Sequence, residues 1–106
     1  MQKTEIENII NEIKEELKQK YSDFRGLYLF GSRARGDFND NSDYDIALIF
    51  DREINWRFKK NIQCLMYDFM LKYDIVIDNP IFRYNQLLQP ESFLAEKIYS
   101  EGIFYG

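Results

Sequence analysis

A glycine-serine pair and two aspartates lie close together along the chain, and their residue types suit two parts of one substrate. Gly31-Ser32 follows an apolar segment, and glycine lets the backbone approach a phosphate so that amide N–H groups point at it. Asp43 and Asp45 are two positions apart, so an extended strand places both carboxylates on one face. Such a pair repels unless a cation holds it, and oxygen ligands on an open edge suit Mg²⁺. Together these features predict chemistry on a nucleoside triphosphate.

Two well-known ligand loops resemble this region but do not match it. Gly31 and Gly36 fit the glycines of a P-loop, but Asp37 and Phe38 stand where that loop needs Lys and Ser or Thr. The acidic run that begins at Asp37 imitates the start of an EF-hand. It lacks the glycine at loop position six and the glutamate at position twelve. A P-loop and an EF-hand calcium site are therefore excluded.

Four further charged positions are candidates for the same site. A two-metal site needs another carboxylate from a neighbouring strand. Asp74 begins the predicted third strand and is the first candidate, and Asp78, on the same strand face, is the alternative. Arg35 is a candidate for neutralising triphosphate charge. Arg33 could do the same, or it could be an ordinary solvent-exposed arginine.

The composition limits the classes of protein and of mechanism. A chain of 106 residues with 45% hydrophobic residues predicts a single domain over residues 1–106 with one modest core. A net charge of −4 argues against a general nucleic-acid binder. Because the chain has no histidine, Ser-His and Cys-His nucleophilic pairs and histidine zinc sites are excluded.

The cysteine content and the apolar runs of the sequence bear on the cellular location of the protein. The single cysteine, Cys64, cannot form an internal disulfide, and its place in a helical pattern predicts that it is a buried small hydrophobe. No apolar run approaches the ~20 residues of a membrane span, and the N-terminus lacks the apolar centre of a signal peptide. We therefore expect a cytoplasmic protein with no membrane contact.

Apolar periodicity predicts the elements that must position these residues. Helices are predicted up to about Lys20, from Trp56 to Tyr73, and from residues 90–92 to Gly102, where the chain leaves the helix. Strands are predicted over 24–30, 45–50, 74–77 and 103–105, with a loop over 31–42 that has room for one short helical turn. This order predicts an α/β or α+β sheet with helices packed on it.

The spacing of the two site motifs carries a family resemblance. Gly31-Ser32, nine further residues and then Ser42-Asp43-x-Asp45 resembles the signature of the nucleotidyltransferase superfamily, which includes DNA polymerase beta and kanamycin nucleotidyltransferase. The fuller string GSRARGDFNDNSDYD resembles the minimal nucleotidyltransferases, the MNT antitoxins encoded beside HEPN toxins in bacteria and archaea. The resemblance covers nearly the whole chain.

That resemblance implies a fold, a site and a reaction. The fold would be a small mixed sheet, like the palm of polymerase beta, with helices on one side. Asp43 and Asp45 would hold two Mg²⁺ ions, with Asp74 as the third carboxylate, and Gly31 and Ser32 would hold the triphosphate tail. A hydroxyl would attack the α-phosphate of a nucleoside triphosphate and release pyrophosphate. In MNT antitoxins this implies AMP transfer from ATP onto a tyrosine of the HEPN toxin.

Three functional hypotheses remain open from the sequence. The first is a Mg²⁺-dependent nucleotidyltransferase that acts as an antitoxin, and the shortness of the chain fits an open site with a partner protein as acceptor. The second is an antitoxin that neutralises its partner by binding alone, through aromatic residues of which four are candidates: Phe82, Tyr84, Phe104 and Tyr105. The third is a stand-alone enzyme that modifies a small hydroxyl compound.

Overall fold

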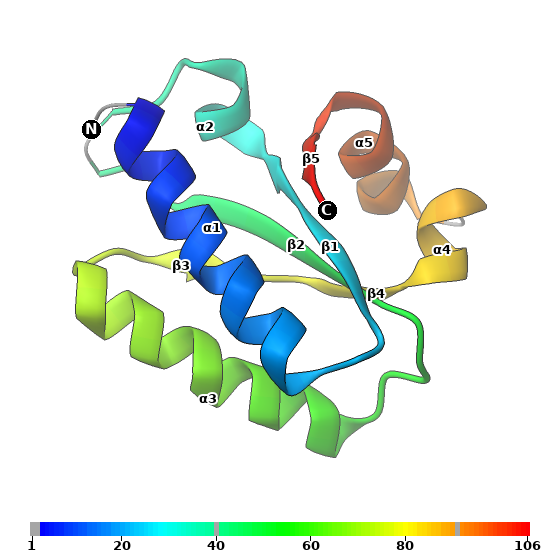
Figure 1. Cartoon of the computed structure of the whole chain (residues 1–106). Coiled ribbons are helices and arrows are strands. Elements are labelled where there is room, and N and C mark those ends of the chain that lie inside the picture. The colour runs from blue at the N-terminus through cyan, green and yellow to red at the C-terminus, as the bar shows by residue number, and fades with distance from the viewer. Residues whose placement is uncertain (1–2, 40, 91) are drawn as a thin grey trace.

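The computed structural model describes residues 3–39, 41–90 and 92–106, and backbone only for Lys3 and Thr4. Figure 1 shows its helices and strands in chain order. They are α1 (Lys3–Lys20), β1 (Phe24–Phe30), α2 (Gly31–Arg35), β2 (Tyr44–Phe50), α3 (Trp56–Tyr73), β3 (Ile77–Asp78), β4 (Ile81–Arg83), α4 (Tyr84–Leu88), α5 (Phe93–Glu101) and β5 (Ile103–Tyr105). The predicted mixed α/β class is confirmed.

The sheet is mixed, and its two central strands carry the site motifs. Its order is β3-β2-β1-β5, and β4 also pairs with β2 beyond the end of β3. Strand β1 runs antiparallel to β2 and β5, whereas β2 runs parallel to β3 and β4. The register sets Phe30 opposite Asp45, so the residue after β1, Gly31, arrives beside that aspartate. On the other side of β2, Asp45 is paired with Asp78.

Helices cover both faces of this sheet. The alternation of β2 directs Ile46, Leu48 and Phe50 into the larger core, where they are buried against α1 and α3. Ala47 and Ile49 face the opposite way, into a smaller core that includes residues of α4 and α5. In Figure 1, α1 and α3 lie on one side of the sheet and α4 and α5 on the other. The implied arrangement with helices on one side only is therefore wrong.

Local sequence explains the helices that were predicted. The buried face of α1 consists of residues at helical spacing, namely Ile6, Ile9, Ile10, Ile13 and Leu17. Helix α3 begins where the Asn55 side chain accepts a hydrogen bond from the Phe58 N–H at 2.9 Å. Ser92 caps α5 in the same way, through the Ala95 N–H. Among the described residues no helix is long and apolar enough to cross a membrane.

The third strand begins later than predicted. Asp74 ends α3 in the left-handed conformation, at φ 52°, and its N–H is bonded to the Met70 carbonyl. The strand starts only at Ile77, so the prediction that Asp74 begins it is wrong. Cys64 is exposed on α3, which corrects its predicted burial. Strand β4 and helix α4 were not predicted, because both lie within a short segment without clear periodicity.

Candidate functional site

The turn from β1 into α2 requires glycine at position 31 because the backbone there lies against the Asp45 carboxylate. Gly31 has φ 72°, and a Cβ built there would overlap Asp45 Oδ2 and lie 3.0 Å from Asp45 Cγ. Helix α2 is short and ends at Gly36, whose N–H bonds the Ser32 carbonyl at 2.9 Å. The Gly-Ser turn and the second aspartate, which the sequence assigns to one substrate, are thus in direct contact, backbone against carboxylate.

Three carboxylates gather at the start of β2, and one of them is Asp78 rather than Asp74. Asp43 is exposed and Asp45 is half-buried. The pKa of Asp45 is raised, first by burial and then by the nearby charges of Asp78 and Asp43, and Arg35 opposes this rise. Asp78 is also the direct strand partner of Asp45. Asp74 lies outside this group, at the exposed end of α3.

The carboxylates fit a cation that the substrate helps to hold. Within residues 3–39, 41–90 and 92–106, no three acidic, histidine or cysteine side chains are close enough to enclose a metal ion by themselves. Mg²⁺, however, usually takes one or two carboxylates and completes its shell with waters and substrate phosphates. A half-buried carboxylate that is destabilised by two others is a suitable ligand for such an ion. The residues present therefore fit the implied metal.

Arg33 is buried, although the sequence left its exposure open. Its side chain is 5% exposed, and Nη2 donates to the Ser42 carbonyl at 2.8 Å and to the Asn39 carbonyl at 3.5 Å. The guanidinium lies 4.0 Å from the ring centre of Tyr44 and 4.7 Å from that of Phe38. Arg33 thereby fastens the loop to the residue just before Asp43.

The second arginine of the motif lies at the surface. Arg35 Nε is 3.2 Å from Asp37 Oδ2, and both side chains are largely exposed. The charge of Arg35 also lowers the pKa of Asp45, so Arg35 lies close enough to the carboxylates to contact a phosphate group that binds beside them. An exposed ion pair of this kind is worth little and is readily exchanged for a phosphate partner.

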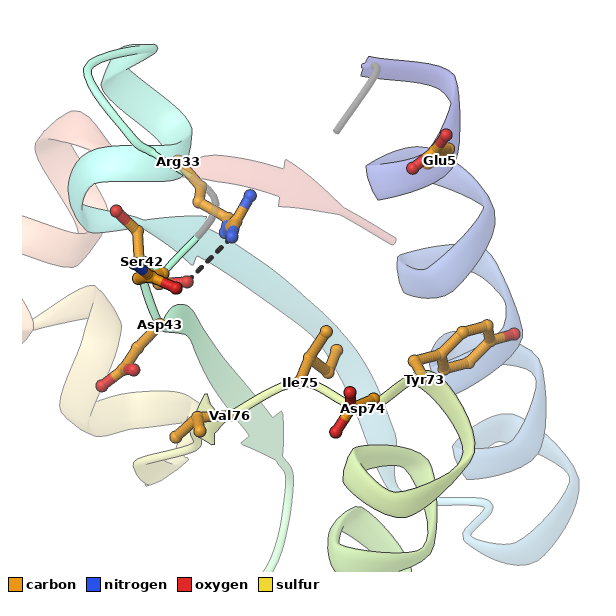
Figure 2. A pocket seen from close by; sticks show the side chains of 9 residues that line it. Glu5, Arg33, Ser42, Asp43, Tyr73, Asp74, Ile75 and Val76 are labelled. Carbon is orange, nitrogen blue, oxygen red and sulfur yellow. Dashed lines mark hydrogen bonds between the residues drawn. The ribbon is translucent and has the colours of Figure 1, made fainter.

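A cavity of about 490 Å³ opens on the other side of Arg33. Figure 2 shows the Arg33 guanidinium pointing into the space between the Ser42 backbone and Glu5 of α1, with Asp74 across from it. The Asp43 carboxylate is turned away from Arg33 at the edge of this cavity. The structure thus brings Asp43 and Asp74 to one cavity, but it does not bring Asp74 to Asp45.

Comparison with known sequences gives consistent matches. A family model described as the nucleotidyltransferase domain matches residues 10–104. MJ0141 of Methanocaldococcus jannaschii, provisionally named a protein adenylyltransferase, is 34% identical over 80 residues, which are 74% of this chain and 81% of that protein. The protein adenylyltransferase MntA of Aphanizomenon flos-aquae is 43% identical over 44 residues, which are 42% of this chain and 29% of MntA.

Solved structures share the fold. A toxin–antitoxin crystallised with AMP-PNP superposes with a TM-score of 0.68 at 23% identity, covering 94% of this chain and 73% of the other. A mutant of the toxin–antitoxin MntA-HpeT gives a TM-score of 0.66 at 21% identity, covering 91% and 72%. At this level of identity the likeness establishes the architecture.

Proposed function

The chain belongs to the nucleotidyltransferase domain family, and from that premise we propose that it transfers AMP from ATP to a hydroxyl group of a partner protein. Family membership makes it a transferase of the nucleotidyltransferase type. The observation that carries the finer proposal is the contact of Gly31 with Asp45, between Asp43 and Asp78. A backbone turn suited to phosphate and a carboxylate cluster suited to a cation meet at one point.

Each residue has a role in the proposed reaction. Gly31 and Ser32 bind the triphosphate tail, and Arg35 neutralises part of its charge. Asp43 and Asp45 would hold two Mg²⁺ ions, which would supply positive charge to stabilise the reacting phosphate. The acceptor oxygen bonds to the α-phosphorus, the bond from that phosphorus to the bridging oxygen breaks, and pyrophosphate leaves. Asp78 takes the acceptor proton, because its charge acts on Asp45 and it is itself exposed to solvent.

The proposed acceptor is a tyrosine of a HEPN-type toxin, which the chain would silence as an antitoxin. Two findings support this choice. A relative is named protein adenylyltransferase MntA, and chains with the same fold come from toxin–antitoxin complexes. The open carboxylate cluster also leaves room for a protein acceptor, since Asp43 and Asp78 are both exposed.

The function is tested by following the label of the α-phosphate. The purified chain is incubated with Mg²⁺, with the protein encoded by the neighbouring gene, and with ATP labelled at either the α- or the γ-phosphate. We expect the α-label on a tyrosine of the partner and the γ-label in pyrophosphate. Transfer of the γ-label alone would identify a kinase and overturn the proposal. Label on a small hydroxyl compound without any partner protein would favour the stand-alone enzyme.

Binding without catalysis is the second candidate, and exposed aromatic residues favour it. Tyr84 and Phe104 are 39% and 52% exposed, whereas Phe82 and Tyr105 are partly buried against the two cores. An exposed aromatic pair of this kind is suited to an interface. If Asp43→Asn still neutralises the toxin in cells as well as the natural chain does, binding is sufficient for protection.

Asp78 and Asp74 are distinguished by their effect on turnover. Asp78→Asn is expected to lower kcat about tenfold to fiftyfold, since it removes the proton acceptor next to Asp45. Asp74→Asn is expected to leave kcat within about twofold, because Asp74 is not among the charges that act on Asp45. The measurement is kcat for AMP transfer at saturating ATP and acceptor. The reverse order of effects would restore Asp74 as the third carboxylate.

A further inference from the structure

The cavity beside Arg33 adjoins the carboxylate cluster without including the glycine turn. Its described lining comes from the first turn of α1, the end of the loop before β2, and the end of α3 with the two residues after Asp74. Gly31 and Ser32 are not among these residues, whereas Asp43 is. Its volume of about 490 Å³ is that of a ligand site rather than of a packing defect.

Arg33 lines this cavity and carries unsatisfied donors. Only Nη2 is hydrogen-bonded, and among the described residues the buried Nε and Nη1 have no hydrogen-bond partner. Buried polar groups in folded proteins are nearly always paired, so two unpaired donor nitrogens, which carry three N–H groups, on a residue 5% exposed indicate an oxygen-bearing ligand. The guanidinium points into the cavity in Figure 2.

The charges around the cavity select among oxygen-bearing ligands. Glu5, Asp43 and Asp74 are exposed acidic residues of its lining, and Arg33 is the one cation among the described lining residues. Without a bound cation, a phosphate or a free carboxylate would be repelled by these groups. A peptide carbonyl would accept hydrogen bonds from the unpaired N–H groups of Arg33 without adding negative charge. A lysine or arginine next to it in the same peptide would be attracted to Glu5 and Asp74. The chemistry that fits is a basic peptide segment.

We propose that this cavity binds a basic segment of the acceptor protein and thereby presents its hydroxyl to the carboxylate cluster. The inference rests on the proposed function, since it names the surface that the acceptor of that reaction uses. In an in-line displacement the attacking oxygen approaches opposite the leaving pyrophosphate. With the triphosphate tail at Gly31-Ser32, a cavity that adjoins Asp43 but excludes that turn is placed for the acceptor.

The first test measures peptide binding without any chemistry. Two peptides of equal length are compared without nucleotide, one with a tyrosine flanked by lysines and one with glutamates in place of the lysines. We expect the lysine peptide to bind, and to shift the Arg33 Nε–H resonance in a ¹⁵N-correlated spectrum. The glutamate peptide should not shift it. No binding of the lysine peptide, or binding that leaves this resonance unmoved, overturns the proposal.

Charge variants test the rim of the cavity. The double variant Glu5→Gln with Asp74→Asn is expected to bind the lysine peptide at least fivefold more weakly. It should raise the KM for the acceptor protein by a similar factor, with kcat and the KM for ATP unchanged. The matched control, Glu53→Gln with Glu101→Gln, removes two exposed glutamates outside the cavity and should change neither value. Equal effects of the two pairs would overturn the proposal.

The two tests separate this proposal from the function on which it rests. If the α-label is transferred to a partner but the Glu5 and Asp74 variant has the natural KM, the transferase function holds and the cavity proposal fails. If the peptide binds as expected but no α-label is transferred, the proposed transfer fails, and with it the acceptor assignment.

Discussion

Asp45→Asn is expected to lower AMP transfer by at least about 10³-fold, the largest effect of any single substitution in the chain. Asp45 is the centre of the carboxylate group, since Gly31 touches it, Asp78 is its strand partner and the charge of Asp43 acts on it. An amide has almost the same shape but carries no charge to hold a cation. The measurement is kcat/KM for transfer of the α-label from ATP, with Asp68→Asn on the exposed face of α3 as the control.

The same substitution should leave the fold intact and stabilise the metal-free protein. Because burial and two neighbouring carboxylates raise the pKa of Asp45 in the folded state, the folded protein binds this proton more tightly than the unfolded chain. The stability of the metal-free protein therefore falls as pH rises through that raised pKa, and an uncharged amide at this position removes the loss. Thermal melting without Mg²⁺ should give a higher Tm for Asp45→Asn at neutral pH, with the difference vanishing below the unfolded pKa.

Added Mg²⁺ should reverse the order of the two melting temperatures, so that the natural chain melts above Asp45→Asn. A cation that binds the folded state stabilises it by mass action, and the natural protein retains the carboxylate that binds it. The Tm of the natural chain should therefore rise with Mg²⁺ and ATP more than that of Asp45→Asn. Equal increases in the two proteins would mean that Asp45 is not a cation ligand, and the proposed roles of the cluster would have to be reassigned.

Features set by neighbours in the chain could be predicted from the sequence. The nearness of Asp43 to Asp45, on whose pKa its charge acts, follows from their spacing of two residues, and the glycine turn follows from its place after an apolar strand. The long helix α3 follows from its apolar period, and its ends agree with the structure. These features depend on a few adjacent residues, so they do not require knowledge of the tertiary fold.

Features that depend on contacts across the sheet could not be predicted in this way. The run after Tyr73 has the composition of a strand, yet Asp74 takes the left-handed conformation that ends α3, and pairing begins only at Ile77. That delay moves Asp78, not Asp74, beside Asp45. The burial of Arg33 depends in the same way on aromatic rings that only the folded loop and β2 bring around it.

Gly31→Ala is expected to lower AMP transfer by at least about 10²-fold, because the new methyl group would occupy the position of the Asp45 carboxylate. Either the carboxylate or the turn must move, and a displacement of about 1 Å in a catalytic group costs roughly 10²-fold. Asp45 is packed between β1 and β3, so it cannot yield without disturbing the pairing on which Asp78 depends.

Gly36→Ala is the matched control for this prediction. Gly36 also has a positive φ, 85°, but no atom lies within 4 Å of a Cβ built there. Both substitutions carry the same backbone penalty, about 1–2 kcal/mol for a left-handed alanine, so Gly36→Ala should lower Tm by that penalty alone and Gly31→Ala by more, because of its overlap with Asp45. Only Gly31→Ala should also lose transfer and Mg²⁺ binding. If Gly36→Ala lost as much activity as Gly31→Ala, backbone strain rather than contact with Asp45 would explain the requirement for glycine. The difference between the two variants therefore isolates the contact that joins the phosphate turn to the carboxylates.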